Sequence, residues 1–135
     1  VVLGKGGRAW DKMSGIFKWG IGGKLGNGRQ WMPWIHLNDE IDGIISCLEN
    51  EVNGPVNLVA PESVRNIDFT KAVGKAMKRP TPFPAPAFAL KLLLGDFAKE
   101  GLLASTKVVP QVLLDAGYEF HFPTIENAMA ELVSD

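Results

Sequence analysis

Short apolar runs alternate along this chain with longer segments whose apolar residues recur at helical spacing. Clusters of glycine and proline separate the two kinds of segment. A helical bundle would need helical spacing throughout, and a β-sandwich would need short strands throughout. The alternation therefore favours an α/β or α+β arrangement, of which we expect α/β.

The local patterns predict where the individual elements lie. Strands are expected where apolar runs end at glycine or proline, and helices where a capping residue precedes apolar residues at helical spacing. The expected strands are Val1–Leu3, Trp31–His36 and Val56–Ala60. The expected helices are residues 8–19, a helix capped by Asn38 or Asp39, a helix capped by Asn66 that buries Phe69, Val73, Ala76 and Met77, an apolar helix over Ala87–Leu94, and a helix capped by Thr124 that buries Ile125, Ala128, Met129, Leu132 and Val133.

The helix after Asp39 carries the strongest periodic pattern. Ile41, Ile44, Ile45 and Leu48 follow the i, i+3, i+4, i+7 spacing of one helical face, so we expect this stripe to pack against a core.

Prolines mark two further features. Pro33 cannot donate a hydrogen bond to a strand ladder, so it predicts an edge position or a bulge. Every second residue from Pro80 to Pro86 is proline, which predicts a stiff, extended spacer into the next helix, with a recognition peptide as the alternative.

Size and charge exclude several classes of function. The chain has 135 residues, enough for one compact domain with a real core. Its 14 basic and 15 acidic side chains give a net charge of −1, so no nucleic-acid footprint is visible. No apolar run is long enough for a membrane span. Cys47 is the only cysteine, which favours a reducing, cytoplasmic location. The chain opens on Val1 without an initiator methionine, as expected of a fragment of a larger protein.

The strong sequence signatures of enzymes are absent. Gly4 to Ala9 matches the G-x-G-x-x-A dinucleotide pattern, but no acid stands between Asp11 and Asp39 to hold a ribose hydroxyl, so we interpret it as a glycine turn before a helix. Gly23-Lys24 is followed by leucine, which excludes a phosphate-binding P-loop. His36 and His121 are the only histidines and lack the spacing of metal ligands, and there is no G-x-S-x-G elbow. No catalytic group and no metal site are predicted.

The segment from Gly26 to Asp39 has the composition of half a binding site. Its glycines allow close approach of backbone to a ligand, Arg29 offers a planar fork of donors, and the indoles of Trp31 and Trp34 offer large faces with one polar atom. The same residues have structural alternatives. Arg29 and Gln30 could brace the loop, the two tryptophans could anchor a core or an interface, His36 could be a hydrogen-bonded structural residue, and Asp39 could be a helix cap rather than a catalyst.

Several motifs, taken in order, resemble one family. They are Val2-Leu3-Gly4 with the glycine-rich loop, Gly26-x-Gly28-Arg29-Gln30, Trp34-Ile35-His36-x-x-Asp39, Gly54-Pro55-Val56-Asn57-Leu58-x-Ala60-Pro61, Arg79-Pro80, Leu94-Gly95-Asp96, and Gly117-Tyr118-Glu119-Phe120. Together they resemble the C-terminal part of NAD(P)-dependent nucleoside-diphosphate-sugar epimerase-like proteins. These are atypical extended short-chain dehydrogenase/reductases, sometimes labelled cell-division inhibitors, with a C-terminal domain of unknown function.

The resemblance implies a division of labour between two halves of a parent protein. An N-terminal Rossmann half would bind NAD or NADP, and this chain would be the substrate-side portion that lacks that half. Residues 1–79 would be the end of the epimerase/dehydratase-like domain, and residues 80–135 the helical domain of unknown function. The Tyr-x-x-x-Lys pair of such enzymes is missing, because the only tyrosine, Tyr118, is followed four residues later by Phe122.

The resemblance also sets expectations for the substrate site. The family's substrate-gripping arginine and the acid beside it correspond to Met32 and Pro33 here, which puts a sugar-nucleotide substrate in doubt unless Arg29 compensates. We expect Arg29, Gln30, Trp34 and His36 to line the cleft of a small-molecule substrate, possible sugar nucleotides included. The fragment alone should be inactive and hold no cofactor. The alternative is a non-catalytic interaction module, such as a cell-division regulator, and in either case the apolar surface left by the missing half predicts self-association.

Overall fold

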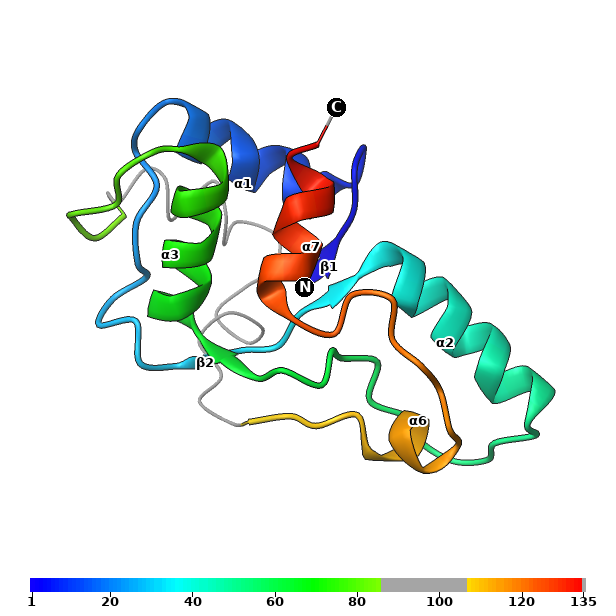
Figure 1. Cartoon of the computed structure of the whole chain (residues 1–135). Coiled ribbons are helices and arrows are strands. Elements are labelled where there is room, and N and C mark those ends of the chain that lie inside the picture. Colours follow the sequence, from blue (N-terminus) through cyan, green and yellow to red (C-terminus); the bar gives the residue numbers. More distant parts are fainter. Residues whose placement is uncertain (86–106, 135) are drawn as a thin grey trace.

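The computed structural model describes residues 1–85 and 107–134, in which short strands and helices alternate (Figure 1). The strands of this part of the chain form two separate pairs, β1 with β3 and β2 with β4. The elements are β1 (Val2–Leu3), α1 (Arg8–Lys18), β2 (Trp31–Met32), β3 (Ile35–His36), α2 (Leu37–Glu49), β4 (Val64–Arg65), α3 (Asn66–Met77), α6 (Gln111–Asp115) and α7 (Ile125–Leu132). The predicted α/β class is confirmed.

Pro33 lies where the extended segment changes partner. Before it, β2 pairs antiparallel with β4, and Trp31 stands opposite Arg65. After it, β3 pairs parallel with β1, and Ile35 stands opposite Val2. Since proline has no N–H for a ladder, its place between the two strands fits the prediction of an interrupted edge.

The hydrophobic core lies between α1, α3 and α7, which gather on one side of the molecule, while α2 and α6 lie on the other (Figure 1). Helices α1 and α3 were predicted within a residue or two of their observed ends, because their apolar spacing and the following glycine or proline are local signals. Thr124 caps α7 as predicted, its hydroxyl accepting the N–H of Asn127. The core draws on both ends of the chain, and its largest members include Leu3, Trp10, Phe17, Trp34, Phe69, Met129 and Leu132.

The apolar stripe of α2 is exposed, so the prediction that it faces a core is wrong for this chain. Ile41, Ile44 and Ile45 are each nearly half exposed, and Leu48 is 74% exposed. The buried face of α2 is a different one, on which Gly43 lies against Leu58 and Leu113. Periodicity identifies an apolar face but not the element that covers it, and nothing in the described part of the chain covers this one.

Other local expectations also need correction. The cap of α2 is His36 rather than Asn38 or Asp39, because the helix begins at Leu37. Asn66 is the first residue of α3, and the cap position is Arg65. The apolar run over Val56–Ala60 forms no strand, although the Ala60 N–H bonds to the Trp34 carbonyl, and the unpredicted strand β4 follows instead.

Two predicted features of the C-terminal part have different outcomes. Val133 is 39% exposed, so it does not belong to the buried face of α7. The expected helix over Ala87–Leu94 lies outside the described residues.

Candidate functional site

The structure separates the four predicted substrate-site residues into two environments. Arg29 is exposed and Gln30 half-buried, and both line an open depression at the end of the glycine-rich loop. Trp34 and His36 are each only 1% exposed and lie inside the molecule. The first pair is therefore accessible from solvent, and the second pair is not.

Hydrogen bonds fix the loop that carries Arg29 and Gln30. The Gln30 side-chain amide donates to the Leu25 carbonyl at 3.0 Å, and the Leu25 N–H donates to the Asn66 side chain at 2.7 Å. Gly28 has a positive φ of 70°, and a Cβ there would lie 2.9 Å from the Cβ of Ile67, so this position admits only glycine without strain. The loop is thus tied to the start of α3 at several points.

The depression has a mixed polar and apolar lining that includes two cationic side chains, Arg29 and Arg65. Its volume is about 550 Å³, and it opens to solvent between the loop and the β2–β4 pair. The Arg65 guanidinium lies over the Trp31 indole, 4.6 Å from the ring centroid, and donates to the Arg29 carbonyl at 3.0 Å. Arg65 was missed by the sequence analysis, because its place beside Trp31 depends on the pairing of strands far apart in sequence. The lining residues are Leu25, Gly26, Asn27, Arg29, Gln30, Trp31 and Arg65.

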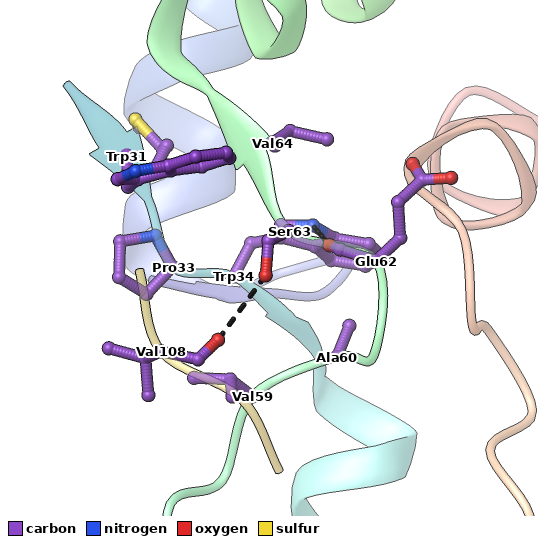
Figure 2. Close-up of a pocket in the computed structure, with 10 residues that line it drawn as sticks. Trp31, Pro33, Trp34, Val59, Ala60, Glu62, Ser63, Val64 and Val108 are labelled. Atoms are coloured by element: carbon purple, nitrogen blue, oxygen red, sulfur yellow. Dashed lines mark hydrogen bonds between the residues drawn. The ribbon is translucent and has the colours of Figure 1, made fainter. Parts of the chain in front are cut away.

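Trp34 is an internal anchor, which is one of the alternatives that its sequence left open. Its indole N–H donates to the Glu62 carbonyl at 3.0 Å. Figure 2 shows the narrow cavity beside it, lined by Trp31, Ser63 and Val108 among others. This cavity has a volume of about 10 Å³, which is room for one water molecule at most. No substrate fits beside Trp34 in this arrangement.

His36 connects β3, α2 and the C-terminal segment. Its Nδ1 accepts the N–H of Asn38 at 3.1 Å, which caps α2. Its ring stacks on Phe122 at a centroid distance of 3.9 Å, and its Nε2 faces the Glu131 carboxylate at 3.4 Å. Since Nδ1 accepts a hydrogen bond, the neutral imidazole carries its proton on Nε2, toward Glu131. These contacts agree with the alternative that His36 is a hydrogen-bonded structural residue.

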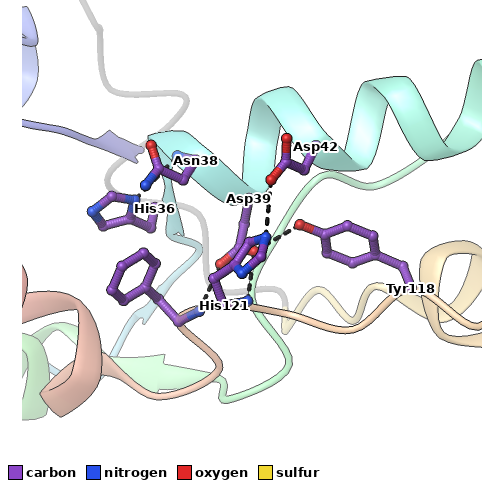
Figure 3. A network of polar contacts seen from close by, with 7 residues as sticks. His36, Asn38, Asp39, Asp42, Tyr118 and His121 are labelled. Atoms are coloured by element: carbon purple, nitrogen blue, oxygen red, sulfur yellow. Dashed lines mark hydrogen bonds and ion pairs between the residues drawn. The ribbon is translucent and has the colours of Figure 1, made fainter.

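Asp39 is the centre of a polar network that the sequence analysis did not foresee (Figure 3). It is fully buried and accepts three hydrogen bonds, from the Tyr118 hydroxyl at 2.7 Å and from the backbone N–H groups of His121 and Phe122 at 2.8 and 2.9 Å. The expectation that Asp39 acts as a cap is wrong, since its carboxylate binds the segment around residue 120. Only the helix position of Asp39 could be read from sequence, because its partners lie about 80 residues away.

The network changes the acidity of its phenol. Burial, and then the hydrogen bond and negative charge of Asp39, raise the pKa of Tyr118 above its ordinary value of 10.0. A second contact lies at the edge of the network, where His121 Nε2 is 2.9 Å from an oxygen of the half-exposed Asp42. At neutral pH Tyr118 therefore donates a hydrogen bond to Asp39.

Within residues 1–85 and 107–134, no three His, Cys, Asp or Glu side chains come together as potential ligands of a metal ion. No helix in the same ranges combines the length and apolar character needed to cross a bilayer.

Comparisons with known proteins place the chain among epimerase family proteins. Residues 85–132 match the domain of unknown function DUF1731. Over 96% of its length, the chain is 40% identical to an epimerase family protein of Mycobacterium leprae. Over 99% of its length, it is 38% identical to the human epimerase family protein SDR39U1. The chain spans 43% and 46% of the lengths of these two relatives.

Solved structures give the same assignment. The crystal structure of human SDR39U1 (isoform 2) with NADPH superposes on 98% of this chain with a TM-score of 0.87 and 37% identity, and the chain covers 45% of it. The nucleoside-diphosphate sugar epimerase from Corynebacterium glutamicum matches with a TM-score of 0.71 and 27% identity, and the chain covers 24% of it. The chain is therefore similar to the C-terminal portion of epimerase family proteins.

Proposed function

We propose that this chain is the substrate-side portion of an NADP-dependent oxidoreductase of the epimerase/dehydratase type, inactive without its N-terminal half. The observation that carries the proposal is the superposition of nearly the whole chain on less than half of a relative crystallised with NADPH. In the parent protein, the cofactor would accept and return a hydride. A reducing compartment, the cytoplasm, suits the single free Cys47.

The strands and α2 support the existence of a missing half. Two-stranded parallel pairs such as β1–β3 are marginal alone, and parallel sheets normally have both faces covered. The exposed stripe of Ile41, Ile44, Ile45 and Leu48 lies on the helix that follows β3. An N-terminal Rossmann half that extended this sheet would supply both the additional strands and the cover for the stripe.

The glycine turn after β1 does not supply a cofactor site by itself. The Gly7 N–H bonds to the Gly4 carbonyl at 2.9 Å, which closes the turn. A Cβ at Gly4 would lie 2.7 Å from the Cβ of Leu37, so protein atoms already fill the space against this glycine. These contacts support the assignment of cofactor binding to the missing half.

The depression beside the loop is the substrate wall in this proposal. Arg29 and Gln30 contact a small-molecule substrate there, while Trp34 and His36 hold the loop and β3 in position behind them. A sugar nucleotide is the substrate class we propose, supported by the similarity to the sugar epimerase from Corynebacterium glutamicum. Arg29 would provide the charged contact that Met32 cannot.

Calorimetric titration with NADPH tests the proposal. We expect no heat of binding for the 135-residue chain and micromolar binding for a protein that also carries the N-terminal half. Binding of NADPH to the 135-residue chain alone would overturn the proposal that the N-terminal half binds the cofactor. A second titration, with UDP-glucose and saturating NADPH, should show weaker binding for Arg29→Ala than for Lys75→Gln, a matched loss of one positive charge on α3.

The exposed stripe on α2 favours a second candidate, a non-catalytic interaction module in which α2 binds a protein partner. The same titration separates the two candidates. A protein with its N-terminal half present that binds neither NADPH nor UDP-glucose would favour the interaction module. Substitution of Ile45 by glutamate would then abolish partner binding, whereas in the enzyme it would disturb the packing of the two halves.

A further inference from the structure

Two cationic side chains lie over the indole of Trp31, and a third lines the depression beside it. The Arg65 guanidinium carbon is 4.6 Å from the centroid of Trp31, and the Lys107 ammonium nitrogen is 5.3 Å from it. Arg29 lines the same depression. Arg65 and Lys107 stand more than 40 residues apart in the sequence, so only the fold brings them together. This is the densest grouping of positive charge around an aromatic ring in the described residues.

The backbone holds Arg65 in this position. Trp31 and Arg65 stand directly opposite each other on antiparallel strands, so their side chains project from the same face of the pair. One guanidinium nitrogen, Nη1, donates to the Arg29 carbonyl at 3.0 Å. A guanidinium has five N–H donors, and this contact leaves the others available to a ligand. Arg65 is thus oriented before any ligand arrives.

No carboxylate of the described residues neutralises this positive charge. Among residues 1–85 and 107–134, no carboxylate lies within ion-pair distance of Arg29, Arg65 or Lys107. The nearby Glu62 is turned toward α7, where it accepts the N–H of Ile125 at 3.1 Å. Like charges held close to one another repel, and a bound anion would relieve that repulsion.

We propose that Arg65 and Lys107, held against Trp31, form together with Arg29 a binding site for a phosphate group. Arginine matches the oxygens of a phosphate with paired donors, and lysine adds a compact point charge. The depression is open and shallow enough to accept a phosphate that is attached to a larger molecule. The proposal rests on the proposed function for the source of that phosphate, which would be the diphosphate of the substrate.

Titration of the full-length gene product with inorganic pyrophosphate, without NADPH and at constant ionic strength, tests the site. Arg65→Gln should weaken binding by about tenfold or more, as expected for the loss of a charge-assisted hydrogen bond. Arg65→Lys should recover part of the loss, because it restores the charge but not the paired donors. Lys107→Gln should weaken binding by a smaller factor, and the matched control Lys75→Gln should leave it within about twofold. The indole N–H signal of Trp31 should shift on titration of the wild type.

The outcomes separate this inference from the proposed function. Pyrophosphate binding that Arg65→Gln removes supports the site even if the protein binds no NADPH. UDP-glucose binding with the same sensitivity to Arg65 identifies a nucleotide diphosphate as the source, and pyrophosphate binding without UDP-glucose binding identifies free phosphate. Absence of pyrophosphate binding to the wild type, or an equal loss in Arg65→Gln and Lys75→Gln, overturns the proposal.

Discussion

Replacement of Asp39 by alanine should destabilise the fold far more than the same replacement at Asp42. Both carboxylates lie on α2, three residues apart, and both contact the segment between residues 118 and 122. Asp39 is fully buried and accepts three hydrogen bonds, whereas the Asp42 side chain is 46% exposed and contacts only His121. The pair of variants therefore compares a buried acceptor with an exposed one on the same helix.

The number of lost hydrogen bonds sets the expected loss in the free energy of unfolding. In Asp39→Ala, the backbone N–H groups of His121 and Phe122 lose their acceptor, and each such loss costs about 1–3 kcal/mol when the group stays buried. With the Tyr118 hydroxyl added, we expect a loss of roughly 3–5 kcal/mol in the free energy of unfolding. Asp42→Ala breaks an exposed pair and should cost less than about 1 kcal/mol.

Urea denaturation followed by circular dichroism measures both changes. Asp39→Asn serves as a milder variant, since its amide oxygen still accepts one or two of the three hydrogen bonds, and it should fall between the other two. The reasoning would be refuted if Asp39→Ala and Asp42→Ala lowered the free energy of unfolding equally. It would also fail if amide exchange at residues 121 and 122 were unchanged in Asp39→Asn.

Four further predictions concern Tyr118, Ile45 and Gly28. Because Tyr118 is the only tyrosine, phenolate absorbance should report its titration alone. Asp39→Asn should lower the midpoint of that titration by about one pH unit. The reason is that a carboxylate 2.7 Å from the phenolate oxygen raises the free energy of the phenolate by about 1.5 kcal/mol even in water. Below pH 10 the Tyr118 phenol is protonated in both the folded and the unfolded chain, so its contribution to stability is complete there. As the pH rises toward the raised pKa of the folded state, this contribution is lost. A series of urea titrations from pH 8 to pH 11 would show the loss. Ile45→Glu should reduce self-association of the isolated chain, measured by sedimentation velocity, without lowering its unfolding midpoint, because this side chain is 45% exposed. Gly28→Ala should cost about 1–3 kcal/mol in thermal or urea unfolding, owing to its positive φ and the close approach of Ile67, and an unchanged midpoint would contradict the geometry.

The elements that sequence predicted well are those with local signals. Thr124 and the apolar residues after it define α7 within one turn of chain, and the same holds for Phe69 and Val73 in α3. The predicted strand over Val56–Ala60 does not form, because a strand also needs a partner. Among the described residues, only the Ala60 N–H of this run has a backbone partner, the Trp34 carbonyl.

The candidate site was predictable only in part. The loop with Arg29 and Gln30 stood out by composition, because glycines, an arginine and two tryptophans stand close together there. Arg65 joins Trp31 through strand pairing, and Asp39 joins Tyr118 across 79 residues. Neither contact leaves a mark on local periodicity, so a single sequence could name these residues without placing them together.

Asp39 and the shared core have a consequence for how proteins of this kind can be divided and recombined. The match to DUF1731 begins at residue 85, yet Ile125, Met129 and Leu132 fill the same interior as Leu3 and Trp10, and a carboxylate near residue 40 needs donors near residue 120. The domain boundary that the match suggests near residue 85 is therefore not a position at which the two parts could be exchanged freely by recombination. A C-terminal segment from another protein would keep these hydrogen bonds only if an acceptor such as Asp39 came with it. We therefore expect the parts of the chain before and after residue 85 to have been inherited together.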